Sequence, residues 1–222
     1  MFAGHYAVGF AATKTPVQLP LWVWFVAVQW LDILFMSLVL LGVEKMRITE
    51  GFTESNDLDL YYMPFTHGLV GALIMSAVFA VLVAAVFKAG RRPVAFMVVA
   101  LASFSHWLLD LVMHTPDMPL LGDDSTKLGL GLWDHFAIGL VLELVLLAAA
   151  TWLYTRAVPL NERGRVLVWG FFALLVALHL YVQLGSTPTS SDAVAASGLA
   201  GYIVVAALAG WVERRAVARP TP

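Results

Sequence analysis

Residues 68–87 read GLVGALIMSAVFAVLVAAVF and contain no charged side chain. A helix needs about 20 apolar residues to cross the hydrocarbon core of a bilayer, and this stretch meets that requirement. On either side of it, further apolar stretches alternate with short polar segments. The six expected spans are residues 20–42, 61–87, 93–113, 131–155, 166–185 and 195–212. The pattern predicts an all-α, polytopic membrane protein with about six transmembrane helices.

The composition of the whole chain agrees with this prediction. Its 222 residues are 60% hydrophobic and only 13% charged, whereas a soluble domain is about one-quarter charged. We therefore exclude a water-soluble globule and expect one integral membrane domain over residues 1–222. The net charge of −2 gives no indication of nucleic-acid binding. Because the chain has no cysteine, any metal must be held by histidine and carboxylate side chains.

The distribution of Lys and Arg predicts the orientation in the membrane. Ten of the thirteen cations fall on one side of the expected spans: Lys14, Lys88, Arg91, Arg92, Arg156, Arg163, Arg165, Arg214, Arg215 and Arg219. Cytoplasmic loops are rich in such residues, so we expect both termini in the cytoplasm. The opposite side is acidic, and we expect its loop carboxylates to form a solvated surface: Glu44, Glu50, Glu54, Asp57, Asp59, Asp117, Asp123 and Asp124.

The apolar stretch 2–12 is too short to cross a bilayer. We expect it to be a half-buried helix that enters the bundle from the cytoplasmic side, because a non-spanning helix is tolerated at this depth only inside protein. His5 would then stand roughly 13 Å above Lys14, within reach of Asp32.

Carboxylates and histidines interrupt the apolar spans, although each buried charge costs at least ~2.5 kcal/mol on insertion scales. The rise of a helix places these groups roughly 18–30 Å from the cytoplasmic end. In order of increasing depth they are Asp32, His106, Glu143, Asp110, and then His67, His114 and His135. The sequence therefore predicts one polar region in the outer half of the bundle.

The spacing of His106, Asp110 and His114 limits how they can act together. His106 and Asp110 lie one helical turn apart and can share an ion or a hydrogen bond. His106 and His114 are separated by about 12 Å of rise, so they cannot bind the same ion in a regular helix. His114 then belongs to a second ion, supports the first, or has no such role. The donor set suits zinc, and also manganese or iron(II).

Each of these residues also has a structural interpretation. His106 and Asp110 can form a buried structural pair, and Glu143 can pair with either to hold helices together. Asp134 suits the first turn of a helix, which leaves His135 facing lipid headgroups. His179 has no carboxylate nearby in its span, and we expect it to be structural.

Four segments, taken in order, resemble a known family. They are Gly4-His5, WLDI at 30–33, PFTHG at 64–68, and SHWLLD at 105–110 followed by Thr115-Pro116 and MPLL at 118–121. Over roughly residues 4–121 the chain resembles the bacterial membrane-bound metal-dependent hydrolases, which include LexA-regulated hydrolases of the inner membrane. The resemblance implies a divalent-metal site, hydrolytic chemistry and a multi-pass protein of the bacterial inner membrane. It implies the metal ligands His5, Asp32, His67, His106 and Asp110.

The chain also departs from the family pattern. Where members carry Asp-x-Asp-His, this chain has DILF at 32–35, and where they carry His-Arg-Gly it has YMP at 62–64. One aspartate and two histidines are therefore missing, which leaves one metal instead of two, or a site without activity. His114 and His135 are possible replacements.

The first functional hypothesis is a metal-dependent hydrolase that acts on a lipid-like ester or phosphate, with zinc as the first candidate metal. Glu143, and after it His135, would be the general base, and His114 an additional ligand. Its weakness is that only Lys45, Arg47 and Lys127 lie near the outer side to hold a phosphate. The alternative is a non-catalytic accessory subunit with membrane-protein partners. An ion or proton permease ranks third, because the inner halves of the spans carry almost no polar residues.

Overall fold

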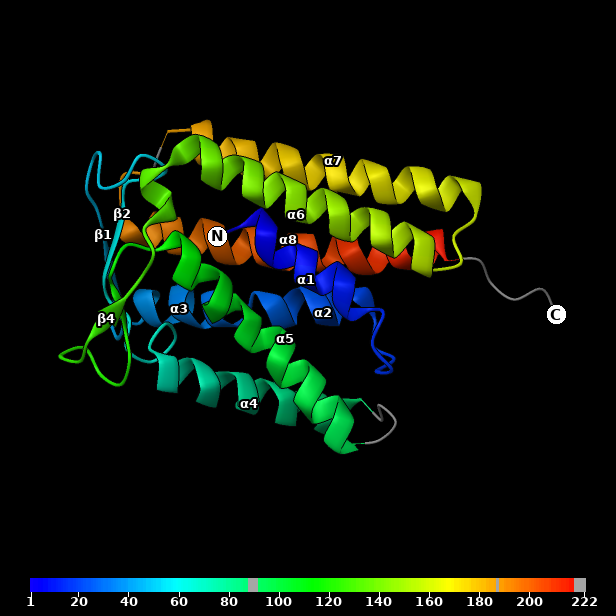
Figure 1. Cartoon of the computed structure of the whole chain (residues 1–222), viewed down its shortest axis with the longest axis horizontal. Helices are drawn as coiled ribbons and strands as arrows, with labels where there is room; N and C mark the ends of the chain where they lie inside the picture. The colour runs from blue at the N-terminus through cyan, green and yellow to red at the C-terminus, as the bar shows by residue number, and fades with distance from the viewer. Residues whose placement is uncertain (88–91, 187, 218–222) are drawn as a thin grey trace.

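The computed structural model describes residues 1–87, 92–186 and 188–217, and in this part of the chain eight α-helices dominate (Figure 1). They are α1 Ala3–Ala12, α2 Leu21–Val28, α3 Trp30–Leu40, α4 Leu69–Val86, α5 Arg92–Met113, α6 Phe136–Ala157, α7 Glu162–Leu184 and α8 Ser191–Ala216. The prediction of an all-α fold is confirmed.

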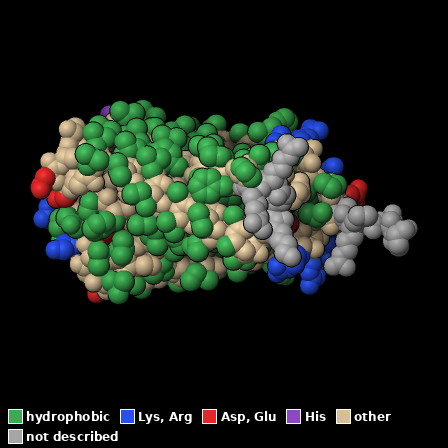
Figure 2. Space-filling view, turned by 90° about the horizontal axis from the view of Figure 1, so that it is seen from below, with side chains coloured by type: hydrophobic (Ala, Val, Ile, Leu, Met, Phe, Trp, Pro, Cys, Tyr) green, Lys and Arg blue, Asp and Glu red, His purple; other side chains and the backbone are tan. Residues whose placement is uncertain are grey.

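Five helices, α4 to α8, are long and apolar enough to cross a membrane. The pair α2 and α3 makes a sixth candidate span, although the two helices are bent by 56°. The outer faces of these helices are apolar, as Leu73, Leu101 and Ile203 illustrate, each of them at least 48% exposed. Figure 2 shows hydrophobic side chains along the length of the molecule and charged side chains gathered at its two ends. The protein is therefore a multi-pass membrane protein.

The first expected span, 20–42, is broken in the structure. Helix α2 ends at Val28 and α3 begins at Trp30, with Gln29 between them in a non-helical conformation. Hydropathy could not predict this break, because the residues on both sides of Gln29 are apolar. The break brings Asp32 into the first turn of α3, where the helix dipole favours a carboxylate.

Two other expected spans begin later than the sequence suggested. The second begins at Leu69 and not at 61, because Leu58–Tyr62 form strand β2, which pairs antiparallel with β1, Lys45–Ile48. The fourth begins at Phe136 and not at 131, after a 3-10 turn over Leu132–Asp134. A short apolar run does not show whether its residues form a strand, a turn or the start of a helix. The predicted starts of these two spans were therefore wrong, although both helices are present.

A second small hairpin joins β3, Met118–Pro119, to β4, Lys127–Leu128. Together with β1 and β2 it covers the end of the bundle at which α3 and α7 end and α4 and α8 begin (Figure 1). The opposite end carries exposed basic side chains that include Arg163, Arg165, Arg214 and Arg215. Lys88, Arg91 and Arg219 lie outside the described residues, as does the side chain of Arg92.

Helix α1 is the buried half-helix that the sequence predicts. It packs against α6, α2 and α5 inside the bundle (Figure 1). Phe10 is fully buried and contacts the rings of Phe25, Tyr154 and Phe171. This aromatic core holds α1 in place, with its N-terminal end in the middle of the molecule and its C-terminal end directed towards the basic end (Figure 1).

Candidate metal centre

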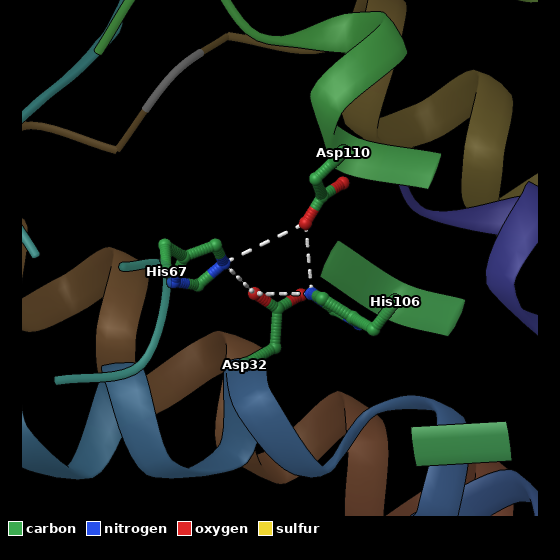
Figure 3. A group of neighbouring side chains, drawn as sticks. All are labelled: Asp32, His67, His106 and Asp110. Carbon is green, nitrogen blue, oxygen red and sulfur yellow. Dashed lines mark ion pairs between the residues drawn. The ribbon is translucent and has the colours of Figure 1, made fainter. Parts of the chain in front are cut away.

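Four ionisable side chains converge in the interior of the bundle (Figure 3). Asp32 comes from α3, His67 from the turn before α4, and His106 and Asp110 from α5. Each offers one ligand atom, and the four atoms all lie within 4.8 Å of one another. Three of the side chains are at most 2% exposed, and that of Asp32 is 15% exposed. The structure thus brings together four of the six residues that the sequence suggested as metal ligands.

The spacing of the ligand atoms fits a metal ion. His106 Nε2 lies 2.9 Å from Asp110 Oδ2 and 3.4 Å from Asp32 Oδ1. His67 Nε2 lies 3.5 Å from each of the two carboxylates. Ligand atoms bound tetrahedrally at 2.0–2.1 Å, as zinc binds nitrogen and oxygen, are about 3.3–3.4 Å apart. The cluster of Asp32, His67, His106 and Asp110 could therefore hold a divalent ion with little movement of its side chains.

The ring of His106 is held by the helix break. Its Nδ1 lies 2.7 Å from the carbonyl oxygen of Val28, the last residue of α2. A carbonyl can only accept a hydrogen bond, so Nδ1 donates and Nε2 is the nitrogen that faces the centre. A metal-binding histidine characteristically donates its other ring N–H to a carbonyl or carboxylate in this way.

His67 is oriented through Thr66 and Glu44. Its Nδ1 lies 2.9 Å from Thr66 Oγ1, and that hydroxyl donates to Glu44 Oε2 at 2.6 Å. The hydroxyl oxygen therefore accepts from Nδ1, and Nε2 again faces the centre. Glu44 Oε1 also accepts from the backbone N–H groups of Phe65 and Thr66. Gly68 completes this turn, because a Cβ there would collide with the carbonyl oxygen of Pro64.

This result corrects the expectation for the acidic loop. Glu44 is only 1% exposed and is part of the support of the metal centre, not of a solvated surface. Asp59 on β2, in the same acidic segment, is also buried and accepts a hydrogen bond from Arg47 Nε at 2.6 Å. No pattern around Glu44 in the sequence distinguishes it from its exposed neighbours.

The two aspartates of the cluster have partners of their own. Tyr202 on α8 donates to Asp32 Oδ2 at 2.7 Å. Asp110 Oδ1 accepts from the amino group of Met1 at 2.7 Å and lies 3.2 Å from His5 Nε2. Each carboxylate therefore has one oxygen hydrogen-bonded to a residue outside the cluster and the other oxygen facing the histidines of the cluster. Tyr202 was not among the residues predicted from the sequence, although a hydroxyl inside an apolar span is a signal that could have identified it.

His5 and His114 lie beside the cluster and not in it. The ring of His5 stacks on that of His106 at a centroid distance of 3.8 Å. His114 approaches the ring of His67 at 5.8 Å, and its Nδ1 pairs with Asp117 Oδ1 at 2.9 Å. The expectation that His106 and His114 do not share an ion agrees with this arrangement.

The two residues suggested as general bases are placed differently. Glu143 is fully buried, and its Oε2 accepts from the backbone N–H groups of Phe2 and Gly4 at 2.9 and 3.0 Å. Buried His179 lies 3.9 Å from the same oxygen. His135 is exposed at the start of α6. The cluster borders a cavity, and neither Glu143 nor His135 is among the described residues that line it.

That cavity has a volume of about 340 Å³. Its polar lining includes Asp32, His67, Asp110 and His114, together with the uncharged Asn56, Gln183 and Ser197. The rest is mainly apolar and comes from α3, from the β1–β2 hairpin, from the end of α7 and from α8. The metal centre therefore opens onto a cavity that can hold a small molecule or one end of a larger one.

Comparison with known proteins finds no match to a family model, to a curated protein or to a solved structure.

Proposed function

We propose that this protein is a membrane-embedded, metal-dependent hydrolase that acts on a lipid-like substrate. The observation that supports the proposal is that the cluster of Asp32, His67, His106 and Asp110 borders an apolar cavity, which three of its residues, Asp32, His67 and Asp110, line directly. A purely structural metal site is usually closed on all sides, whereas a catalytic one keeps a position open to substrate. The resemblance in residues 4–121 supports the same reaction class, zinc as first candidate metal, and the bacterial inner membrane as location.

In this proposal, some residues would bind the metal ion and others would orient these ligands. His67 and His106 would bind the ion through Nε2, and Asp32 and Asp110 would each bind it through one oxygen. When bound, a divalent cation supplies Lewis acidity and lowers the pKa of water towards neutrality. Val28, Thr66 and Tyr202 hold the ligands in orientation through their hydrogen bonds. The apolar cavity wall excludes bulk water, which strengthens the electrostatic interactions inside.

Glu143 serves a different purpose in this proposal. Its carboxylate bonds with two backbone N–H groups at the start of α1, and such bonds anchor a helix end. We therefore assign Glu143 to the anchoring of α1, and leave its catalytic role as a sequence-based hypothesis that a Glu143→Gln variant tests.

Metal content and hydrolysis together test the proposal. The detergent-purified protein, loaded with zinc, manganese or iron(II), is analysed for bound metal beside His106→Ala and Asp110→Ala. His135→Ala is the control, because His135 is exposed outside the cluster. We expect one ion per chain in the wild type and in the control, and none in the two cluster variants. Absence of metal from the wild type after reconstitution contradicts the proposal.

Hydrolysis is then measured on mixed lipids in vesicles, with product detection by mass spectrometry. The metal-loaded wild type and His135→Ala should release product, and chelation should stop the release. A protein that binds the ion in the predicted cluster but cleaves no lipid class has a structural metal centre, and the hydrolase proposal fails.

A further inference from the structure

The cavity of the metal centre reaches the lipid-facing surface between α7 and α8. Tyr181 and Val182 of α7 line it and are 74% and 58% exposed. Across from them Ser197 and Gly201 of α8 line it and are exposed too. Both helices are candidate spans, so an exposed apolar residue on them faces hydrocarbon. A hydrocarbon chain could therefore pass sideways from the bilayer to the cluster.

The opening has free space beside Gly201. A Cβ on Gly201 would meet no other atom within 4 Å, so the space beside this residue is open. At the next turn, a Cβ on Gly198 would only touch Met36 at ordinary van der Waals distance. The volume of about 340 Å³ lies near the lower limit of small-molecule sites, which is about 300 Å³. It suits a head group and part of one chain.

The charges around the cavity do not suit a phosphate. Among its described lining residues there is no Lys or Arg, and Asp32 and Asp110 are acidic. The amino group of Met1 is already bound to Asp110. The three cations expected on this side of the membrane are held elsewhere: Arg47 by Asp59 at 2.6 Å, Lys127 by Asp123 at 2.9 Å, and Lys45 over the ring of Tyr62. Proteins bind phosphate through Arg, Lys, free backbone N–H groups or a bound metal ion. Apart from the proposed divalent ion, whose charge Asp32 and Asp110 would balance, the described lining of this cavity offers no such group.

An uncharged acceptor is free instead. Gln183 lines the cavity, and its Oε1 is buried without a hydrogen-bond partner among the described residues. An unpaired buried acceptor is costly, so a ligand that donates a hydroxyl or amide hydrogen would relieve it. The site therefore favours a head group that is neutral and carries a donor.

We infer that the cavity receives a single-chain amphiphile with an uncharged, hydroxyl- or amide-bearing head group, joined to its chain by an ester or amide bond. The chain enters between α7 and α8. Resting on the proposed function, this ligand is also the substrate: the oxygen of water adds to the acyl carbon and the bond from that carbon to the head group breaks. The proton of the water passes to the leaving oxygen or nitrogen, which yields a fatty acid and a neutral alcohol or amine.

Photocrosslinking tests this inference without relying on turnover. The probes are a monoacylglycerol with a diazirine in its chain and a lysophosphatidic acid with the same chain. They are added to the full chain in nanodiscs, with and without chelator. We expect the monoacylglycerol probe to label peptides of α7 and α8 about tenfold more than the phosphate probe. Equal labelling by the two, or stronger labelling by the phosphate probe, overturns the inference.

Gly201→Trp should obstruct the opening and lower the labelling by about tenfold, the loss expected when about two methylene groups can no longer be buried. Gly170→Trp is the matched control, because Gly170 is an exposed helical glycine with open space beside it and is not part of the cavity. Gly201→Leu should give an intermediate loss, and retained metal content shows that the variants fold. Undiminished labelling of Gly201→Trp contradicts the inference.

The two proposals fail in different ways. Labelling with the expected preference but without hydrolysis of any lipid supports the ligand class and contradicts the hydrolase. Metal-dependent hydrolysis of phosphate-bearing lipids alone supports the hydrolase and contradicts the ligand class.

Discussion

His67 and His106 present the same ring nitrogen to the centre because each has its Nδ1 engaged by a fixed acceptor. For His106 that acceptor is the carbonyl of Val28, and for His67 it is the hydroxyl of Thr66, which Glu44 holds in turn. The supporting bonds therefore set both the ring orientation and the atom that can bind a cation. Without them, each ring would be free to rotate or to change tautomer, and the four ligand atoms would not converge.

Thr66→Val tests this support. Valine keeps the shape of threonine but cannot accept the hydrogen bond of His67 Nδ1, and loss of such a partner typically weakens metal binding about 10- to 100-fold. Competition with a zinc chelator of known affinity measures the change. Thr155→Val is the control. Thr155 lies in the last turn of α6, outside the metal centre, and its hydroxyl donates to the nearby carbonyl oxygen of Trp152. An unchanged zinc affinity in Thr66→Val shows that the Thr66 hydroxyl does not support the site.

Metal binding should also depend on pH. Burial by itself would lower the pKa of His67, but hydrogen bonds to Asp110 and Asp32 and their negative charges raise it to about 9. The metal-free ring is therefore protonated at pH 7, and a cation must displace that proton. We expect zinc binding to release protons at pH 7 and the apparent affinity to fall as the pH is lowered. Calorimetry in two buffers of different ionisation enthalpy measures the release, and a heat that is independent of buffer contradicts it.

Helix α1 depends on Glu143 for its position. Helix α1 is ten residues long, too short to cross a membrane, and its first N–H groups lie inside the bundle. Glu143 Oε2 accepts from two of them. Since His5 in the same helix stacks on His106, the position of α1 also affects the ligand set.

Glu143→Ala should destabilise the fold by about 2–4 kcal/mol, because it leaves two buried N–H groups without an acceptor. Glu143→Gln retains an acceptor oxygen and should cost less than half as much. Unfolding in mixed detergent micelles measures both. Equal losses would show that the charge of Glu143, and not its role as acceptor, matters. Loss of hydrolysis in a stably folded Glu143→Gln would instead favour the sequence-based hypothesis of a general base.

The molecule as a whole has two ends of different character. Exposed Arg163, Arg165, Arg214 and Arg215 lie at one end, and both small hairpins cover the other (Figure 1). The β1–β2 hairpin contributes to the cavity of the metal centre, so this centre lies towards the second end. The positive-inside rule then predicts that the basic end faces the cytoplasm. In that orientation the opening between α7 and α8 lies in the outer leaflet.

Single cysteines can test this orientation, because the chain has none of its own. Asp124 in the β3–β4 loop and Glu162 at the start of α7 are both exposed, and they make a matched pair of substitutions. In spheroplasts a membrane-impermeant maleimide should label Asp124→Cys at once, and Glu162→Cys only after lysis. The reverse result contradicts the predicted orientation and moves the metal centre to the inner leaflet.

Much of the fold follows from local composition. The free energy of moving a residue into hydrocarbon depends on that residue and its neighbours in the helix, so the apolar stretches were found correctly, as was the buried half-helix α1. The break at Gln29 was missed because the residues on both sides of it are apolar. The strand at Leu58–Tyr62 was missed because a run of five residues is too short to give a clear pattern. The pairing of β2 with β1 depends on contacts between segments, which hydropathy does not record.

The metal centre was predictable in part for a similar reason. Sequence spacing identifies Asp32, His106 and Asp110 as polar groups at related depths, but rise along a helix says nothing of which way a side chain points. Glu143 was placed beside His106 by depth, yet in the structure it binds the start of α1. Glu44 and Tyr202 join the centre from a distant loop and a distant helix. Their contributions arise from tertiary packing, because only packing brings groups 22 or 170 residues apart in the chain within hydrogen-bond distance.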